Sequence, residues 1–210
     1  SLMSGPNVAI IDYGAGNLRS VAKALESLGA NPMVTDDLKE MEASDALILP
    51  GQGACDSAMM ALQAHELTDF VKQAINIGHP FFGVCLGLQL LFDSTEEGNV
   101  DCLGIIPGRV RRFPTGLKVP HMGWNTVEVQ QMDHPVFATI PQGSHFYFVH
   151  SFYSEPESSE ALAATTEYGL VFCSAVAQGN LVATQFHPEK SGPTGLRLYE
   201  NFLHMVGSLA

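Results

Sequence analysis

The chain has 210 residues, a length that suits one domain, and a formal net charge of -12. This acidic balance argues against binding to nucleic acid or an anionic membrane surface, and it disfavours direct binding of a phosphorylated substrate. Hydrophobic residues make up 46% of the chain and charged residues 15%, which leaves ample material for a core. No apolar run approaches the ~18 residues that a membrane-spanning helix needs, and no signal peptide is visible.

Four cysteines are scattered along the chain without C-x-x-C spacing, at Cys55, Cys85, Cys102 and Cys173. This pattern predicts neither a disulfide framework nor a zinc site, and it is typical of a protein from a reducing cytoplasm. Residues 1–6 have no hydrophobic pattern. We therefore predict a disordered start or cloning remnant over residues 1–6, one domain over residues 7–210, and no metal or cofactor site.

In the first half of the chain, short apolar runs alternate with amphipathic segments. The runs at residues 8–12, 33–34, 46–49 and 81–84 predict strands, and residues 18–28, 56–64 and 68–77 have helical spacing. Apolar residues at helical spacing also continue from residue 86. This alternation predicts a parallel sheet with helices on both faces.

The second half changes character and is rich in predicted strands. They cover residues 109–113, 124–130, 144–149, 162–166, 171–177 and 181–186, and a closing helix follows over residues 196–206. The predicted fold class is α/β, with a mostly parallel central sheet flanked by helices and a β-rich C-terminal half.

The most informative residue is Cys85, which lies at the turn between a buried strand and the following helix, with Gly83 and Gly87 on either side. A strained turn that pushes a nucleophile outward needs small neighbours, because larger side chains would collide with the strand or helix. The helix N-terminus favours the thiolate, and the N–H of Leu86 can point at an oxyanion. A buried structural cysteine is the alternative, but the paired glycines favour a nucleophile.

A candidate base lies at the end of the last predicted strand. Pro188 cannot donate to the sheet ladder, so the strand ends there and leaves His187 at its tip. Glu189 is close enough in sequence to curl back and hold the imidazole. Cys85, His187 and Glu189 are therefore the candidate nucleophile, base and orienting carboxylate.

Two further turns contain glycine and follow strands. The turn at residues 14–16 lacks the third glycine of a dinucleotide-binding motif because Arg19 stands in its place, so a tight turn is the better interpretation. The turn at Gly51, Gln52 and Gly53 is either a plain turn or a source of oxyanion donors, since its N–H groups can face a developing charge.

These motifs together resemble the class-I (triad) glutamine amidotransferases. The resemblance rests on residues 83–89, GVCLGLQ, and residues 187–189, HPE, in this order and at this separation. Residues 118–125, KVPHMGWN, are similar to a signature of the glutaminase subunit of imidazole glycerol phosphate synthase, and residues 12–17, 50–53 and 185–191 agree with it. The resemblance covers nearly the whole chain.

The resemblance implies hydrolysis of L-glutamine through a thioester on Cys85. It implies that ammonia passes to a (β/α)-barrel cyclase subunit, which makes imidazole glycerol phosphate in histidine biosynthesis. It also implies that Gln89 and the backbone of His150, Ser151 and Phe152 contact the α-amino or carboxylate group of glutamine. A solvent-exposed helix residue is the alternative for Gln89.

The resemblance also places part of the surface against that cyclase. The predicted contact residues are Tyr13, Gly16, Asn17, His121, Trp124 and Tyr147, although polar packing accounts equally well for His121 and Tyr147. In related amidotransferases the loop at Gly51–Gly53 must rearrange to present its N–H, and many relatives carry a small apolar residue where Gln52 stands. We therefore expect a poor glutaminase that a partner switches on.

Three alternatives remain at this stage. The chain could serve another synthase, such as anthranilate, aminodeoxychorismate or pyridoxal phosphate synthase, but residues 119–125 disfavour these. It could be a binding module that kept the fold and lost activity, which the intact set of Cys85, His187 and Glu189 disfavours. A cysteine peptidase is disfavoured by Gln89 and by the full family pattern.

Overall fold

The computed structural model describes residues 5–207, and its first half alternates strands and helices as predicted. The strands are β1 (Asn7–Ile11), β2 (Asn31–Thr35), β3 (Ala46–Leu49) and β4 (Phe81–Val84). They pair in parallel in the order β2-β1-β3-β4. Near the C-terminus, β13 (Leu181–Thr184) adds in parallel to β4, so a strand from near the end of the chain lies beside one from the first half.

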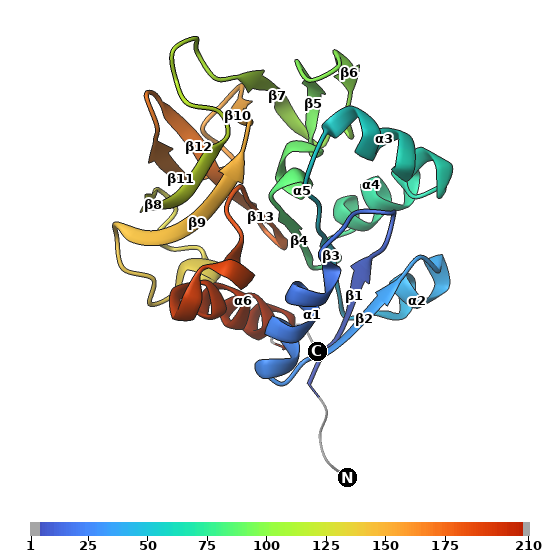
Figure 1. Cartoon of the computed structure of the whole chain (residues 1–210). Coiled ribbons are helices and arrows are strands. Elements are labelled where there is room, and N and C mark those ends of the chain that lie inside the picture. The colour runs from blue at the N-terminus through green and yellow to red at the C-terminus, as the bar shows by residue number, and fades with distance from the viewer. Residues whose placement is uncertain (1–4, 208–210) are drawn as a thin grey trace.

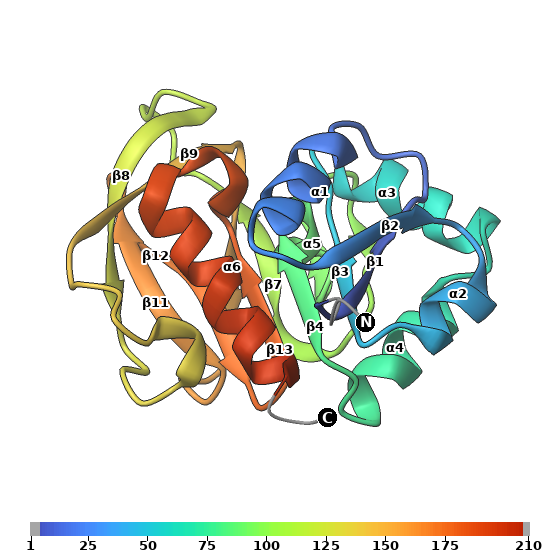
Figure 2. The same ribbon diagram turned by 90° about the horizontal axis from the view of Figure 1, so that it is seen from below.

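Helices cover both faces of this parallel sheet (Figures 1 and 2). One face carries α1 (Leu18–Ser27) and α6 (Gly192–Gly207), and the other carries α2 (Leu38–Ala43), α3 (Cys55–Ala64) and α4 (Thr68–Asn76). Side chains of β1 alternate between the two cores, as the strand geometry requires. Val8 and Ile10 pack in the core with α1 and α6, whereas Ala9 and Ile11 pack in the core with α2, α3 and α4.

The second half extends the sheet with mainly antiparallel strands. Beyond β13 the order is β12-β10-β7-β5-β6, and the β8–β9 hairpin attaches through β11. The α/β class with a β-rich second half is confirmed. The strands are β5 (Phe92–Thr95), β6 (Val100–Asp101), β7 (Ile106–Arg112), β8 (His121–Val129), β9 (Ser144–His150), β10 (Phe152–Pro156), β11 (Leu162–Glu167) and β12 (Val171–Gln178).

The segment after Cys85 begins with a helix as predicted, but this helix is short. The helix α5 (Leu86–Gln89) is a single turn, and β5 begins at Phe92. Every residue from 86 to 92 is buried, so the apolar spacing reflects burial on all sides and not one face of a longer helix. The carbonyls of Leu90 and Leu91 accept from the N–H groups of Leu103 and Ile105, at 2.9 Å and 2.8 Å. The short elements α2, β5, β6 and β10 were not predicted.

The beginning of the described chain is tied to the sheet. Residues 1–4 of the predicted disordered start lie outside the described residues. The carbonyls of Gly5 and Pro6 accept hydrogen bonds from the side chain and backbone N–H of Asn31, at 3.1 Å and 2.9 Å. Within residues 5–207, no helix is long and apolar enough to cross a bilayer.

Two glycines allow the chain to turn sharply after β4. A Cβ atom on Gly83 would lie 2.6 Å from the carbonyl oxygen of Gly87, and one on Gly87 would lie 2.0 Å from the carbonyl oxygen of Leu49 on β3. Both obstacles are backbone atoms that cannot move aside, so neither position has room for a side chain. The expectation that small residues must flank Cys85 is confirmed.

We expect Gly87→Ala to destabilise the fold, because overpacking of this kind costs about 1–3 kcal/mol. The free energy of unfolding in urea measures the effect. Gly16→Ala is the matched control, since a Cβ atom there meets nothing within 4 Å. Equal stability of Gly87→Ala and the wild type would contradict the close approach of α5 to β3.

Candidate active site

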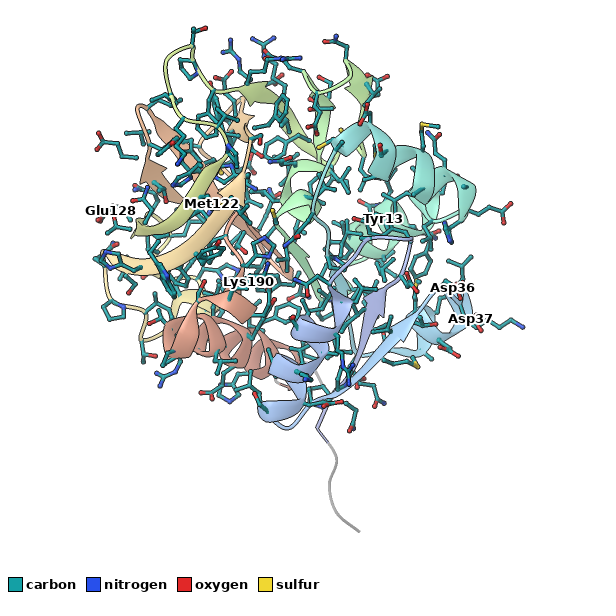
Figure 3. The ribbon with its side chains drawn as sticks, in the orientation of Figure 1. Tyr13, Asp36, Asp37, Met122, Glu128 and Lys190 are labelled. Atoms are coloured by element: carbon teal, nitrogen blue, oxygen red, sulfur yellow. The ribbon has the colours of Figure 1, made fainter. Side chains whose placement is uncertain are left out.

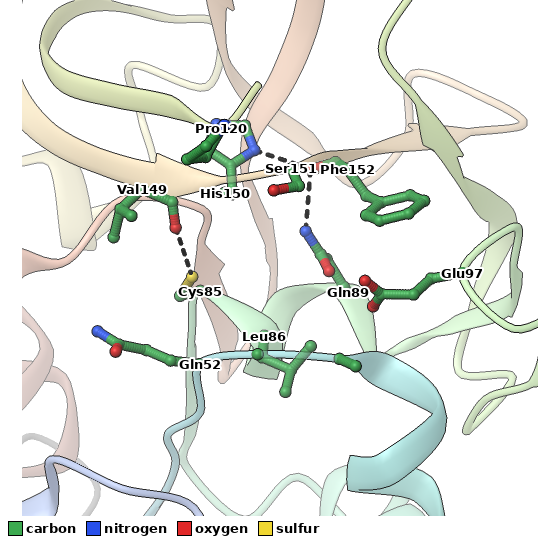
Figure 4. Close-up of a pocket in the computed structure, with 12 residues that line it drawn as sticks. Gln52, Cys85, Leu86, Gln89, Glu97, Pro120, Val149, His150, Ser151 and Phe152 are labelled. Atoms are coloured by element: carbon green, nitrogen blue, oxygen red, sulfur yellow. Dashed lines mark hydrogen bonds between the residues drawn. The ribbon is translucent and has the colours of Figure 1, made fainter. Parts of the chain in front are cut away.

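Cys85 occupies the turn between β4 and α5, with φ 56° and ψ -104°. Such a backbone is rare for a residue other than glycine, costs about 1–3 kcal/mol, and persists only where the surroundings fix it. Here the N–H of Cys85 donates to the carbonyl of Thr184 on β13 at 2.7 Å. The side chain, 5% exposed, borders a pocket (Figure 4). Since α5 has only four residues, its dipole contributes less to the thiolate than we expected.

His187 and Glu189 meet as the sequence predicted, in a turn that follows β13. The strand ends at Thr184, slightly earlier than expected, and the 3-10 turn η2 (Pro188–Lys190) brings Glu189 back toward the ring. Nδ1 of His187 lies 2.8 Å from Oε2 of Glu189. The hydroxyl of Tyr199 on α6 donates to Oε1 of the same carboxylate at 2.9 Å. Each carboxylate oxygen therefore has its own partner, and Tyr199 is a neighbour that the sequence did not predict.

The electrostatics of this pair favour a charged imidazolium. Burial acts to lower the pKa of His187, but the neighbouring Cys85 sulfur and the Glu189 carboxylate raise it to about 9. Burial acts to raise the pKa of Glu189, and the hydrogen bonds from His187 and Tyr199 outweigh it and hold this pKa below its usual range. Nε2 of His187 is buried and has no hydrogen-bond partner in the described chain.

The Cys85 sulfur completes the group. Its thiol donates to the carbonyl of Val149 at 3.7 Å (Figure 4), and the side-chain amide of Gln185 donates to the sulfur at 3.7 Å. These are long contacts that leave the thiol free to turn toward His187. The site therefore lines up a thiol, an imidazole with a free nitrogen and a buried carboxylate, in that order in space. These are the groups that nucleophilic acyl transfer needs.

The expected oxyanion donor is occupied. The N–H of Leu86 donates to the carbonyl oxygen of Gly51 at 3.1 Å, so it was wrong to treat this N–H as free. The hydroxyl of Tyr13 donates to the carbonyl of Pro50 at 2.7 Å, and it lies where a Cβ atom on Gly51 would be, at 2.2 Å. Gln52 and Gly53 border the pocket beside this bond. The loop must turn its Gly51 carbonyl away before Leu86 can hold an oxyanion.

The pocket in front of Cys85 has a volume of about 450 Å³. Gln89 and the residues His150, Ser151 and Phe152 all line it, so the structure brings the predicted substrate contacts together (Figure 4). Gln89 is not a solvent-exposed helix residue, because it is only 4% exposed. Its amide nitrogen donates to the carbonyl of Phe152 and to Oε1 of Gln185, both at 3.0 Å.

Glu97 is a pocket residue that the sequence analysis missed. It lines the cavity with Cys85 and Gln89, and its Oε1 accepts from the N–H of Cys55 at 2.6 Å. It lies between β5 and β6, two strands that were not predicted, so nothing placed it near the nucleophile. Its carboxylate gives the pocket an acidic group suited to an ammonium ion.

Two of the six predicted interface residues are not on the surface. Tyr13 is 2% exposed and His121 is 3% exposed, because Tyr13 turns inward from the loop after β1 and His121 turns inward from β8. Tyr147 is half-buried, and its ring centroid lies 6.1 Å from that of Trp124. The exposed members are Gly16, Asn17 and Trp124, and the neighbouring Met122 on β8 is also exposed (Figure 3).

Comparisons with known proteins identify the family of this chain. The family described as Glutamine amidotransferase class-I matches residues 9–206. The imidazole glycerol phosphate synthase subunit HisH of Dehalococcoides mccartyi (strain CBDB1) is 49% identical over 200 residues, covering 95% of this chain and 97% of the relative. The subunit of the same name from Synechococcus sp. (strain JA-3-3Ab) is 47% identical over 207 residues, covering 97% and 96%.

Solved structures show the same fold at lower sequence identity. One described as a glutamine amidotransferase superposes with a TM-score of 0.73 at 23% identity, covering 95% of this chain and 98% of the other. PurLQS from Thermotoga maritima superposes with a TM-score of 0.74 at 18% identity, covering 95% and 98%. The chain belongs to the class-I glutamine amidotransferase family and, within it, to the HisH subunits of imidazole glycerol phosphate synthase.

Proposed function

We propose that this chain hydrolyses L-glutamine to glutamate and ammonia, with Cys85 as the nucleophile, His187 as the acid and base, and Glu189 as the group that orients His187. The observation that carries the proposal is the strained turn that holds Cys85 at the pocket, beside an imidazole whose Nε2 is free. The family membership fixes the reaction class, and the geometry supports these three roles.

The reaction proceeds in two halves. The proton of the Cys85 thiol lies on His187 as the imidazolium, and the Cys85 thiolate attacks the carboxamide carbon of glutamine. The resulting oxyanion is held by the N–H of Leu86, after the loop has turned, and by an N–H of the Gly51–Gly53 loop. The imidazolium donates its proton as ammonia leaves, which gives a glutamyl thioester. His187 then removes a proton from water, and hydrolysis of the thioester releases glutamate.

The pocket has groups for the other end of glutamine. The Glu97 carboxylate is placed to pair with the α-ammonium group, and charge-assisted hydrogen bonds of this kind are about twice as strong as neutral ones. Gln89 and the backbone of Ser151 and Phe152 border the same space and are suited to the remaining polar atoms of the amino acid. In this orientation the side-chain carboxamide of the glutamine substrate points toward Cys85.

The partner in this proposal is the (β/α)-barrel cyclase subunit of imidazole glycerol phosphate synthase, in the cytoplasm. The relatives are named as subunits of that synthase, which supports an assembly with a second chain. The net charge of -12 makes this chain a poor site for a sugar phosphate, so the ammonia acceptor belongs on the partner. The exposed Met122 and Trp124, with Gly16 and Asn17, provide the contact surface.

Chemical labelling tests the role of Cys85. We expect an electrophilic glutamine analogue to modify Cys85 alone among the four cysteines, and Cys85→Ala to abolish glutamine hydrolysis while the chain stays folded. Peptide mass spectrometry locates the label, and circular dichroism checks the fold. Modification of Cys55, Cys102 or Cys173 with Cys85 untouched would contradict the assignment.

The pH dependence of kcat/KM tests His187 and Glu189. Ammonia departure needs the imidazolium, so activity should fall on the alkaline side as His187 loses its proton near pH 9. Glu189 is one of the groups that raise this pKa, so Glu189→Gln should move the alkaline limb to lower pH with only partial loss of activity. His187→Ala should be nearly inactive. If the alkaline limb of Glu189→Gln falls at the same pH as that of the wild type, the proposed role of Glu189 is ruled out.

The occupied oxyanion donor predicts weak activity in the free chain. Binding of the cyclase can activate only if the cyclase prefers the turned loop, and a hundredfold activation requires about 2.7 kcal/mol of such preference. We expect glutamine turnover to rise by about a hundredfold when the cyclase and its own substrate are added. Equal turnover with and without them would exclude this gate, and failure of the two chains to associate would exclude the proposed partner.

A further inference from the structure

The signature at residues 118–125 has an outward and an inward side. On β8, Met122 and Trp124 are exposed, and the proposed function uses them as partner contacts. His121 and Asn125 lie on the opposite side of the strand, where His121 is buried and Asn125 half-buried. The proposed function leaves these two polar side chains without a role.

The inward residues begin a chain of hydrogen bonds that leads to the pocket. Nδ2 of Asn125 lies 3.2 Å from Nε2 of His121, and Nδ1 of His121 lies 2.8 Å from Nε2 of His150. Nδ1 of His150 lies 2.7 Å from the carbonyl oxygen of Phe152 (Figure 4). The pairing of β8 with β9 sets His121 directly opposite His150, so the register of the hairpin creates the central link.

Only one arrangement of protons satisfies this chain when both rings are neutral. A carbonyl oxygen can only accept, so His150 must carry its proton on Nδ1 and accept at Nε2. His121 must then carry its proton on Nδ1 and accept from Asn125 at Nε2. The same amide donates its second N–H to the carbonyl of Glu167 at 2.9 Å, and its oxygen accepts from the N–H of Thr126 at 2.7 Å.

The surroundings keep both rings neutral. Burial lowers the pKa of His121 to about 4 and that of His150 to about 3, and His187 adds to the effect on His150. The ring of Tyr168 stacks on His121 at a centroid distance of 4.1 Å. The ring of Phe148 also stacks on His121, with the two centroids 4.9 Å apart, so two aromatic rings pack against the imidazole.

The chain ends on an atom that shapes the substrate pocket. The Phe152 carbonyl that accepts from His150 also accepts from the Gln89 amide at 3.0 Å. His150, Phe152 and Gln89 all line the cavity beside Cys85. Fixing this one carbonyl therefore fixes the direction of the Gln89 side chain and of the turn that follows β9.

We propose that His121 and Asn125 are positioning residues, which hold His150 and the Phe152 carbonyl in the orientation that binds glutamine. They act through other groups and do not touch the substrate. This inference rests on the proposed function, because it concerns the same pocket. It also gives the signature two distinct tasks, since its outward side chains meet the partner while its inward side chains order the pocket.

The proton arrangement can be tested on the unmodified chain. In ¹⁵N NMR spectra of histidine-labelled protein at pH 7, both rings should be neutral and both should carry the proton on Nδ1. Assignment comes from comparison with spectra of the His121→Phe and His150→Phe variants. A proton on Nε2 of either ring, or a charged ring at pH 7, would overturn the proposal.

Kinetics of the complex with the cyclase test the positioning role. His121→Phe keeps the aromatic packing and removes the donor to His150, so the KM for glutamine should rise by about tenfold, the equivalent of roughly one hydrogen bond, while kcat changes much less. Asn125→Leu removes the outer donor and should shift KM in the same direction by a smaller factor. His145→Phe, an exposed position on the same hairpin, is the matched control and should match the wild type.

The outcomes separate the two proposals. An unchanged KM in folded His121→Phe and Asn125→Leu would overturn the positioning role while leaving the glutaminase intact. A wild-type complex that does not hydrolyse glutamine would instead refute the proposed function. If His121→Phe does not fold, Asn125→Leu decides the kinetic question.

Discussion

The backbone turn at Cys85 is the constraint on which the site depends. Its positive φ of 56° places the Cys85 side chain at the pocket, and the same turn packs α5 directly against β3. A Cβ atom on Gly87 would collide with β3, and one on Gly83 would collide with the carbonyl oxygen of Gly87. The parallel pairing of β4 with β13 then brings the turn that carries His187 to the same edge of the sheet. The packing of these strands and of α5 therefore sets both the backbone strain at Cys85 and the position of the reactive side chains.

The same close packing explains why the resting site is incomplete. With α5 pressed against the end of β3, the N–H of Leu86 meets the carbonyl of Gly51 in the loop that follows, at 3.1 Å. A buried N–H left without a partner costs about 1–3 kcal/mol, so the free chain satisfies it internally. Any ligand or partner that exposes this N–H must make better interactions with the turned loop. The tight turn that presents the proposed nucleophile thus also occupies the proposed oxyanion donor.

Sequence patterns predicted the parts of the site that depend on local order. Glycines around Cys85 and the proline after His187 each impose a backbone geometry that short-range rules capture. The helix after Cys85 was predicted, but its end was not, because a fully buried segment has no polar face to mark where the helix stops. Glu97 was missed because its position depends on pairing of distant strands, and His121 was misplaced because strand register decides which side chains turn inward.

The most direct test of this account is a crystal structure of the chain bound to the cyclase, with a glutamine analogue attached to Cys85. The account predicts that the Gly51 carbonyl has turned away and that the N–H of Leu86 donates to the oxygen of the analogue. The structure would contradict the account if Leu86 still donated to Gly51 while the analogue was bound.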